Sequence, residues 1–200
     1  MTPRIQPLAP AECSEAHRRV LATTLPRVAD LEGKPGDARR QRDAKPLPIL
    51  GVIAHHPALL EPFVAFSTAL ALRGVLARRD SELLALRTAW SCGSEFEWGH
   101  HVRYALSAGL SREEIARVPA GPEAAGWSQR ERALLRAADE LREESRISDA
   151  TWETLAAQLD AAQLVEVVFT VGQYTALSML ANSAGVELEA GYERLPPRAD

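Results

Sequence analysis

The pattern of apolar and polar positions predicts a chain built almost wholly of helices. Runs of Ala, Leu, Arg and Glu dominate the sequence, and these residues are strong helix formers. No stretch shows the alternation of β-branched and polar residues that marks a half-buried strand. The predicted fold class is therefore all-α, with about eight helices and mostly short connections.

Glycine and proline divide the first half of the chain into five predicted helices. These run over residues 10–29, 47–57, 58–73, 82–92 and 94–109. The first is interrupted by Pro26, and Gly74 ends the third. Asp80 or Ser81 is expected to cap the fourth helix. Residues 30–46, rich in glycine, proline and charge, predict a long loop.

Two capping boxes mark helix starts in the second half. Ser111 with Glu114 opens a short helix, and Ser128 with Glu131 opens a longer one. The longer helix has an apolar stripe at Ala133, Leu134, Ala137, Ala138 and Leu141. A further helix is expected from Ser148 or Asp149 through Leu159. The last, residues 162–185, is apolar nearly all round and is expected in a core or an oligomer interface.

Length and composition predict one soluble globular domain. A chain of 200 residues buries enough apolar surface to fold without a disulfide or metal. We expect a single domain over 1–200, with its core at about 48–190, the loop at 30–46 and a loose or wrapped tail at 191–200. Apolar residues make up 46% and charged residues 25%, which is typical of soluble proteins.

Charge and cysteine usage exclude several classes of protein. The net charge of −4 argues against a nucleic-acid partner. No apolar run reaches the roughly 20 residues of a membrane span, and the N-terminus lacks the apolar core of a signal peptide. Cys13 and Cys92 are far apart and form no CxxC motif, which predicts the reducing cytoplasm and no disulfide.

Candidate chemistry gathers between Glu82 and Tyr104. Ser94, Glu97 and His101 share one helix face, because residues three, four and seven apart lie on the same side. A carboxylate one turn from an imidazole holds its tautomer and raises its basicity, so a buried Glu97–His101 pair is a ready general acid/base. His100 lies about 100° further round the helix, so the two rings are not expected to serve one atom.

Two other interpretations of this cluster remain open. An exposed Glu–His pair adds only solubilising charge. A metal site with Glu82, Glu97, His100 and His101 as ligands would use groups that zinc and non-haem iron accept. The sequence has no HExxH motif and no further ligand is identified, so no metal is predicted.

The stretch ELLALRTAWSCGSEFEWGHHVRYALSAGLSREEI, residues 82–115, resembles the carboxymuconolactone decarboxylase-like proteins. Their superfamily includes alkylhydroperoxidase D. The resemblance extends more weakly to residues 55–66 and 170–189, and it covers about two-thirds of the chain. It implies an alkylhydroperoxidase D-like helical fold and a homo-oligomer, either a dimer, a trimer or a hexamer.

The resemblance also implies which chemistry is missing. The peroxidase branch has a glutamate, a CxxC motif and then a histidine one helical turn after the second cysteine. With that histidine placed on His101, the cysteines fall on Ser94 and Glu97, and the glutamate falls on Glu82. Both redox cysteines are absent, so the thiolate attack and disulfide closure of a CxxC peroxidase are excluded.

The remaining set, Glu82, Glu97 and His101, implies a cofactor-free lyase or decarboxylase, or an isomerase, acting on a small oxo-acid or lactone. In this interpretation His101 is the proton donor or base, Glu97 orients it or shares its proton, and Glu82 completes the relay. Ser94, Trp98 and His100 are the candidate substrate contacts. The alternatives are a peroxide-reducing redox protein and a non-catalytic oligomeric accessory protein.

Two further polar groups are ambiguous from sequence. Arg87 is expected to pair with Glu82 or solvent, or with a substrate carboxylate. Tyr174 and Asn182 lie on the apolar last helix, and either a pocket or a bond between helices accounts for them.

Overall fold

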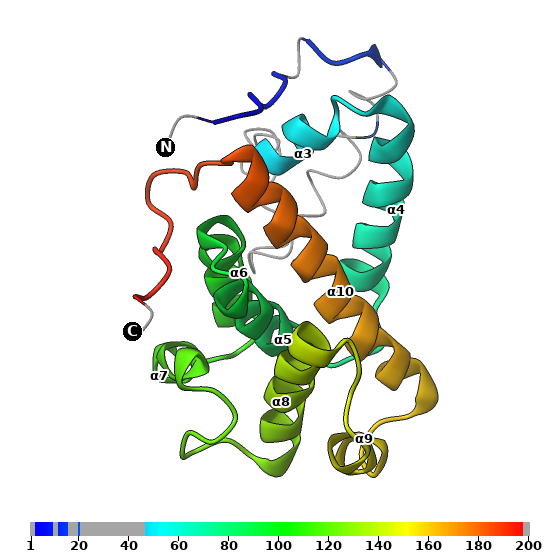
Figure 1. Cartoon of the computed structure of the whole chain (residues 1–200), viewed down its shortest axis with the longest axis vertical. Coiled ribbons are helices and arrows are strands. Elements are labelled where there is room, and N and C mark those ends of the chain that lie inside the picture. The colour runs from blue at the N-terminus through cyan, green and yellow to red at the C-terminus, as the bar shows by residue number, and fades with distance from the viewer. Residues whose placement is uncertain (1–2, 10–11, 16–19, 21–46, 198–200) are drawn as a thin grey trace. The chain divides into compact units, whose positions relative to one another are not determined.

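The fold is all-α, as predicted. A computed structural model describes residues 3–9, 12–15, 20 and 47–197 (Figure 1). The predicted loop at 30–46 and most of the predicted helix at 10–29 lie outside the described residues. Within them there are eight α-helices, one 3-10 helix and no strand. They are α3 (Pro48–Ile53), α4 (Pro57–Arg73), α5 (Arg78–Ser91), α6 (Glu95–Ser107), α7 (Arg112–Arg117), η1 (Val118–Ala120), α8 (Gln129–Glu144), α9 (Asp149–Ala156) and α10 (Ala161–Ala184).

The chain divides into two compact units. One comprises Met1–Arg73 and Leu180–Glu187, and the other comprises Gly74–Met179 and Leu188–Asp200. In the first unit, α3 starts on a proline, as helices favour, and the Leu8 amide donates to the Gly51 carbonyl at 3.1 Å. All the candidate site residues lie in the second unit.

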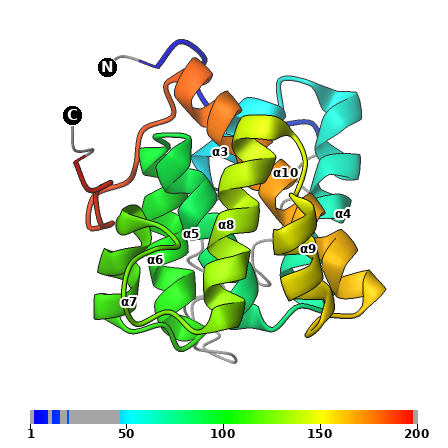
Figure 2. The same cartoon turned by 60° about the horizontal axis from the view of Figure 1, so that its bottom comes forward.

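Helix α5 is the centre of the second unit. Its residues from Glu82 to Ala89 are all buried, and it packs against both α6 and α8 (Figure 2). Leu84 belongs to an apolar cluster with α8, α9 and α10. Leu83 and Leu86 belong to a second cluster with Trp98 and Val102 of α6. Because α5 is covered on two sides, polar groups that it carries inward must find partners in the interior.

Predicted capping signals are confirmed at the starts of α7, α8 and α9, and Ser94 adds a cap at α6 that was not predicted. Ser111 and Ser128 both form complete capping boxes. Ser94 and Ser148 cap α6 and α9 by accepting a backbone N–H. Four of the five residues of the predicted α8 stripe are buried, and Leu141 is partly buried.

Three predicted boundaries are wrong. Helix α3 ends at Ile53, short of the predicted residue 57. Helix α5 begins at Arg78 after Ala77, which makes no side-chain cap, so neither Asp80 nor Ser81 is the cap. Asp80 instead lies in the first turn, buried, in an ion pair with Arg130 of α8. Helix α9 ends at Ala156, short of the predicted Leu159.

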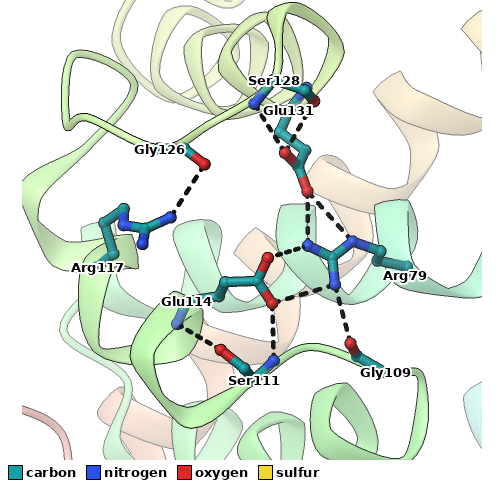
Figure 3. Close-up of polar contacts among 8 residues, drawn as sticks. All are labelled: Arg79, Gly109, Ser111, Glu114, Arg117, Gly126, Ser128 and Glu131. Carbon is teal, nitrogen blue, oxygen red and sulfur yellow. Dashed lines mark hydrogen bonds and ion pairs between the residues drawn. The ribbon is translucent and has the colours of Figure 1, made fainter.

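The glutamates of both capping boxes also bind one arginine (Figure 3). Arg79 of α5 donates to Glu131 at 2.7 Å, to the Gly109 carbonyl at 3.0 Å, and to Glu114. The Arg79 hydrogen bond lowers the pKa of Glu114. Burial raises the pKa of Glu131, but hydrogen bonds from Arg79 and Ser128 outweigh it and leave that pKa lowered. Arg79 thus joins α5 to the starts of α7 and α8.

The segment after α10 is held along α6, so the predicted loose tail is wrong for the residues that the structure describes there. The Arg103 guanidinium lies 3.7 Å from the ring centre of Tyr192. Arg194 pairs with Glu95 at 2.7 Å, and Glu193 pairs with Arg112 at 3.0 Å.

Helix α10 is long and apolar enough to cross a membrane by length and composition alone, which the sequence analysis did not anticipate. Half of its most apolar window is buried in the structure, as in a core helix of a soluble protein. Its buried residues include Leu164, Val167 and Val171 of the apolar cluster. The buried Glu166 accepts hydrogen bonds from the Val75 and Leu76 amides. Helix α10 therefore has a packing role within the fold.

Candidate active site

Three predicted site residues, Glu82, Glu97 and His101, meet inside the second unit. The Nδ1 atom of His101 lies 2.7 Å from Oε2 of Glu82. The Nε2 atom of the same ring lies 3.7 Å from Oε2 of Glu97. Each of the three residues is only 4% exposed. One imidazole is thus held between two buried carboxyl groups.

The local sequence explains this meeting. Ser94 caps α6, so Glu97 and His101 lie one turn apart on the same face. Gly93, with a φ of 63°, makes the turn between α5 and α6, a conformation that glycine adopts readily. Helix α6 then packs along α5, which places Glu82 beside a residue that is 19 positions later in the chain.

The hydrogen bond to Glu82 fixes the orientation of His101. A carboxylate only accepts, so the imidazole donates its Nδ1–H and directs the Nε2 lone pair toward Glu97. Arg78 adds a second partner for Glu82, with Nη2 at 2.7 Å from Oε1. Arg78 was missed by the sequence analysis, although the spacing of four residues between Arg78 and Glu82 signals such a pair.

Glu97 is the unusual member of the cluster. No described residue donates a hydrogen bond to its carboxyl group, although the residue is buried. Burial raises the pKa of Glu97 above its ordinary value of 4.5, and the charges of His101 and His100 offset only part of that rise. A buried carboxyl without a hydrogen bond is costly to the fold, which makes it a candidate for chemistry.

Two tyrosines surround His101. The Tyr174 ring of α10 lies 4.3 Å from the imidazole centre, edge to face, and Tyr104 lies 5.3 Å away. Burial and the charges of Glu82 and Glu97 raise the pKa of Tyr174 well above 10.0, so its phenol stays neutral. The sequence alone did not decide whether Tyr174 lines a pocket or forms a hydrogen bond between helices. In the structure its ring packs on His101, the candidate base.

The three predicted substrate contacts all pack within the fold, but the buried Trp98 Nε1 and His100 Nδ1 have no hydrogen-bond partner among the described residues. Ser94 is fully buried, and its Oγ accepts the Glu97 amide at 3.4 Å as the cap of α6. Trp98 is 1% exposed and lies in the apolar cluster with Leu83. The Nε2 atom of His100 lies 3.1 Å from Oε2 of Glu189. Substrate contact by these residues stays a prediction.

The expected pairing of Arg87 with Glu82 or with solvent is wrong. Its guanidinium binds Asp139 of α8 in a two-point pair, with Nε–Oδ1 at 2.6 Å and Nη2–Oδ2 at 2.9 Å. The remaining Nη1 donates to the Val118 carbonyl at 2.9 Å. Arg87 therefore joins α5, η1 and α8 and does not pair with Glu82.

A metal site with both His100 and His101 as ligands would need the two rings to face one ion. In the structure His100 pairs with Glu189, and His101 pairs with Glu82. Within the residues that the structure describes, no group of three or more His, Cys, Asp or Glu side chains is arranged to hold a metal ion.

Comparison with known proteins agrees with the fold. The model of the Carboxymuconolactone decarboxylase family matches residues 57–140, a range that includes all three clustered residues. A peroxidase-related protein from Ralstonia eutropha with an alkylhydroperoxidase AhpD core is similar at a TM-score of 0.74 and 16% identity, covering 95% of this chain and 94% of that one. No curated protein matches the chain.

Two other solved structures are similar. A variant of the debrominase Bmp8 in complex with 2,3,4-tribromopyrrole has a TM-score of 0.74 and 12% identity, over 95% of this chain and 94% of that one. A protein of unknown function from Agrobacterium tumefaciens, described as a putative antioxidant defence protein AhpD, has a TM-score of 0.64 and 21% identity, over 69% of this chain and 95% of that one. These likenesses show a shared fold.

Proposed function

We propose that this chain is a cofactor-free lyase acting on a small oxo-acid or lactone, because residues 57–140 match the model of the Carboxymuconolactone decarboxylase family and the sequence has no CxxC motif. The proposed catalytic residues are Glu82, Glu97 and His101. One observation carries the proposal. His101 is fixed by Glu82 on one side and directs its other nitrogen toward Glu97, a buried carboxyl that accepts no hydrogen bond from the described residues.

The raised pKa of Glu97 suits a general acid. A carboxyl that keeps its proton closer to neutral pH can deliver that proton to carbon during turnover. His101 then supplies the next proton through Nε2, and Glu82 stabilises the imidazolium that takes part in this exchange. The two distances around the ring, 2.7 Å to Glu82 and 3.7 Å to Glu97, support this division of roles.

The proposed reaction is decarboxylation. The bond between the carboxylate carbon and its neighbour breaks, carbon dioxide leaves, and the electron pair enters a conjugated carbonyl as an enolate. Glu97 protonates the carbon, and water replaces that proton through His101. One carboxylate and one proton become carbon dioxide and a C–H bond. Isomerisation by proton transfer uses the same groups without loss of carbon dioxide.

A direct test is carbon dioxide release by metal-stripped protein from oxaloacetate, acetoacetate and carboxylated butenolides. The variants are Glu97→Gln and His101→Gln, and the matched control is Glu95→Gln. Glu95 lies on the same helix but is only partly buried and pairs with Arg194 at 2.7 Å. We expect release by the wild type and by Glu95→Gln, with at least a 100-fold loss in the other two. Undiminished release by Glu97→Gln would overturn the proposal.

Other outcomes point to the alternative functions. Proton exchange in deuterium oxide without carbon dioxide release would indicate an isomerase. Consumption of peroxide that is abolished by Cys92→Ser would indicate a redox protein. If the wild type shows none of these activities, the lyase proposal fails and the accessory-protein hypothesis gains weight.

We also propose that the protein is a cytoplasmic homo-oligomer. Support comes from α10, where Val165, Phe169 and Met179 are 55%, 51% and 58% exposed. Exposed apolar side chains along one helix favour association. Light scattering after size-exclusion chromatography would give the mass, and Phe169→Glu should shift it toward the monomer. A wild-type monomer at high concentration would contradict this proposal.

A further inference from the structure

Helix α10 contributes Tyr174 to the candidate site. Its ring meets the imidazole of His101 at 4.3 Å between centres, with an angle of 75° between the planes. An edge-to-face contact of this kind holds both rings in place. A phenylalanine would serve that packing equally well, so the packing does not account for the hydroxyl group.

The Tyr174 hydroxyl makes no hydrogen bond to any described residue. Tyr174 is only partly buried, so its O–H can donate to water or to a small ligand that reaches His101. Burial and the charges of the nearby Glu82 and Glu97 raise the pKa of Tyr174. Neither carboxyl group accepts a hydrogen bond from the Tyr174 hydroxyl. The site therefore contains a neutral donor that the fold does not use.

We infer that the Tyr174 hydroxyl is a catalytic donor that binds the substrate oxygen on which negative charge develops as carbon dioxide leaves. This inference rests on the proposed function. It gives the donor role to Tyr174 and not to Ser94, which caps α6 and is fully buried. It also narrows the substrate to molecules with a carbonyl conjugated to the carbon that loses its carboxylate.

The geometry separates two tasks in the reaction. Glu97 and His101 handle the proton that reaches carbon, and Tyr174 handles the charge on oxygen. A donor fixed in a site with little water stabilises such charge more strongly than water does, since it needs no reorientation during the reaction. The Tyr174 ring is already fixed against His101, so its hydroxyl meets that requirement before substrate binds.

The test is Tyr174→Phe, which keeps the ring and removes only the oxygen. We expect kcat for the decarboxylated substrate to fall about 100-fold to 1000-fold, as for loss of one donor to a developing oxyanion, with KM changed less than threefold. The matched control is Tyr192→Phe, which removes a phenol that packs on Arg103 in the same unit. That control should retain kcat within twofold, and both variants should keep the wild-type circular dichroism spectrum.

A second measurement does not depend on turnover. Oxalate mimics the enolate that forms when oxaloacetate loses carbon dioxide, and its binding is measured by calorimetry. We expect Tyr174→Phe to weaken oxalate binding at least tenfold and Tyr192→Phe to leave it unchanged. Failure of the wild type to bind oxalate, or equal binding by Tyr174→Phe, would overturn the inference.

The two proposals fail separately. If Glu97→Gln is inactive while Tyr174→Phe keeps full kcat, the lyase stands and the role of Tyr174 falls. If Glu97→Gln is fully active, the proposed acid is wrong, and oxalate binding alone then decides whether Tyr174 is a donor.

Discussion

His101 and Glu82 come from different helices and are joined at 2.7 Å between Nδ1 and Oε2. This hydrogen bond sets the orientation and the tautomer of the His101 imidazole. It places the imidazole proton on the Glu82 side and leaves Nε2 to face Glu97. Arg78, at 2.7 Å from the other oxygen of Glu82, supports that arrangement from the first turn of α5.

Glu82→Gln should release the tautomer of His101. The amide keeps the size of the side chain but loses the charge that stabilises the imidazolium, so we expect kcat to fall about 100-fold to 10,000-fold, the range for loss of general acid–base catalysis. Nitrogen NMR of the histidines is the second readout. The His101 Nδ1–H signal should change in Glu82→Gln and persist in Glu97→Gln. An unchanged spectrum in Glu82→Gln would contradict the fixed tautomer.

Glu97→Gln should stabilise the protein at neutral pH while it removes activity. The raised pKa of Glu97 means that the folded state binds this proton more tightly than the unfolded state. The Glu97 contribution to stability is therefore fully present below the ordinary pKa of 4.5, and it is lost as pH rises toward the raised value. The glutamine variant does not have this loss, so its advantage should grow from acid to neutral pH.

The measurement for Glu97→Gln is the melting temperature between pH 4.5 and pH 8, with Glu95→Gln as control. We expect a gain of about 2–4 °C at pH 8, which corresponds to about 1 kcal/mol for a chain of this size. The gain should shrink toward pH 4.5, and the control should show no such trend. If the gain in melting temperature were instead largest at pH 4.5, the pKa of Glu97 would not be raised in the folded state.

Local signals predicted much of the fold. The two capping boxes place the starts of α7 and α8 correctly, because the serine and glutamate of each box lie within one turn. The start of α5 was misplaced because Asp80 has a partner 50 residues away, Arg130, which attracts its carboxylate away from a capping role. Helical periodicity contains no information about such distant partners.

In the candidate site, too, contacts within one helix were predicted and contacts between distant helices were not. Helix geometry predicted the meeting of Glu97 and His101, and the family resemblance supplied Glu82. The partner of Arg87 was missed because Asp139 is 52 residues away on α8. The contact between Tyr174 and His101 joins two helices that are not consecutive in the chain, so only the tertiary structure reveals it.

Arg79→Met should lower stability mainly at neutral pH. Arg79 helps hold the pKa values of Glu114 and Glu131 below their ordinary range. The stability that these glutamates contribute is present above their unfolded pKa and is lost as pH falls through the folded values. Because Arg79 is partly exposed, with 31% of its side-chain surface accessible, we expect a loss of only about 1–2 kcal/mol at pH 7.

Urea unfolding at pH 7 and pH 3 measures this loss, and Arg136→Met is the matched control. Arg136 pairs with Glu123 on the surface, where 42% and 69% of the two side chains are exposed, so its removal should cost less than about 0.5 kcal/mol. The defect of Arg79→Met should shrink at pH 3, since protonation of the glutamates weakens the charge interaction that Arg79 makes with them. An equal defect at both pH values would show that lost packing, rather than charge, is responsible.

Two helical glycines should respond to alanine in opposite directions. A Cβ at Gly99 would lie 2.6 Å from Cδ1 of Leu188 and 3.1 Å from the Glu193 carbonyl oxygen. Leu188 can rotate away, but the carbonyl belongs to the backbone of the segment that follows α10. A Cβ at Gly172 of α10 would meet nothing within 4 Å. Gly172→Ala should therefore stabilise the protein by about 0.5–1 kcal/mol through helix propensity.

Gly99→Ala should destabilise the protein, because displacement of residues 188–195 costs more stability than the higher helix propensity of alanine adds. That segment is held by the Glu189–His100 pair at 3.1 Å and by the stacking of Arg103 on Tyr192. Displacing it should lower the melting temperature and speed tryptic cleavage after Arg194. Glu82 and His101 contact each other on another face of α6, so the nitrogen NMR signal of His101 should persist. If Gly99→Ala stabilises the protein and the cleavage rate is unchanged, residues 188–195 accommodate the new methyl group without loss of stability. The close contact at Gly99 would then not hold this segment in place.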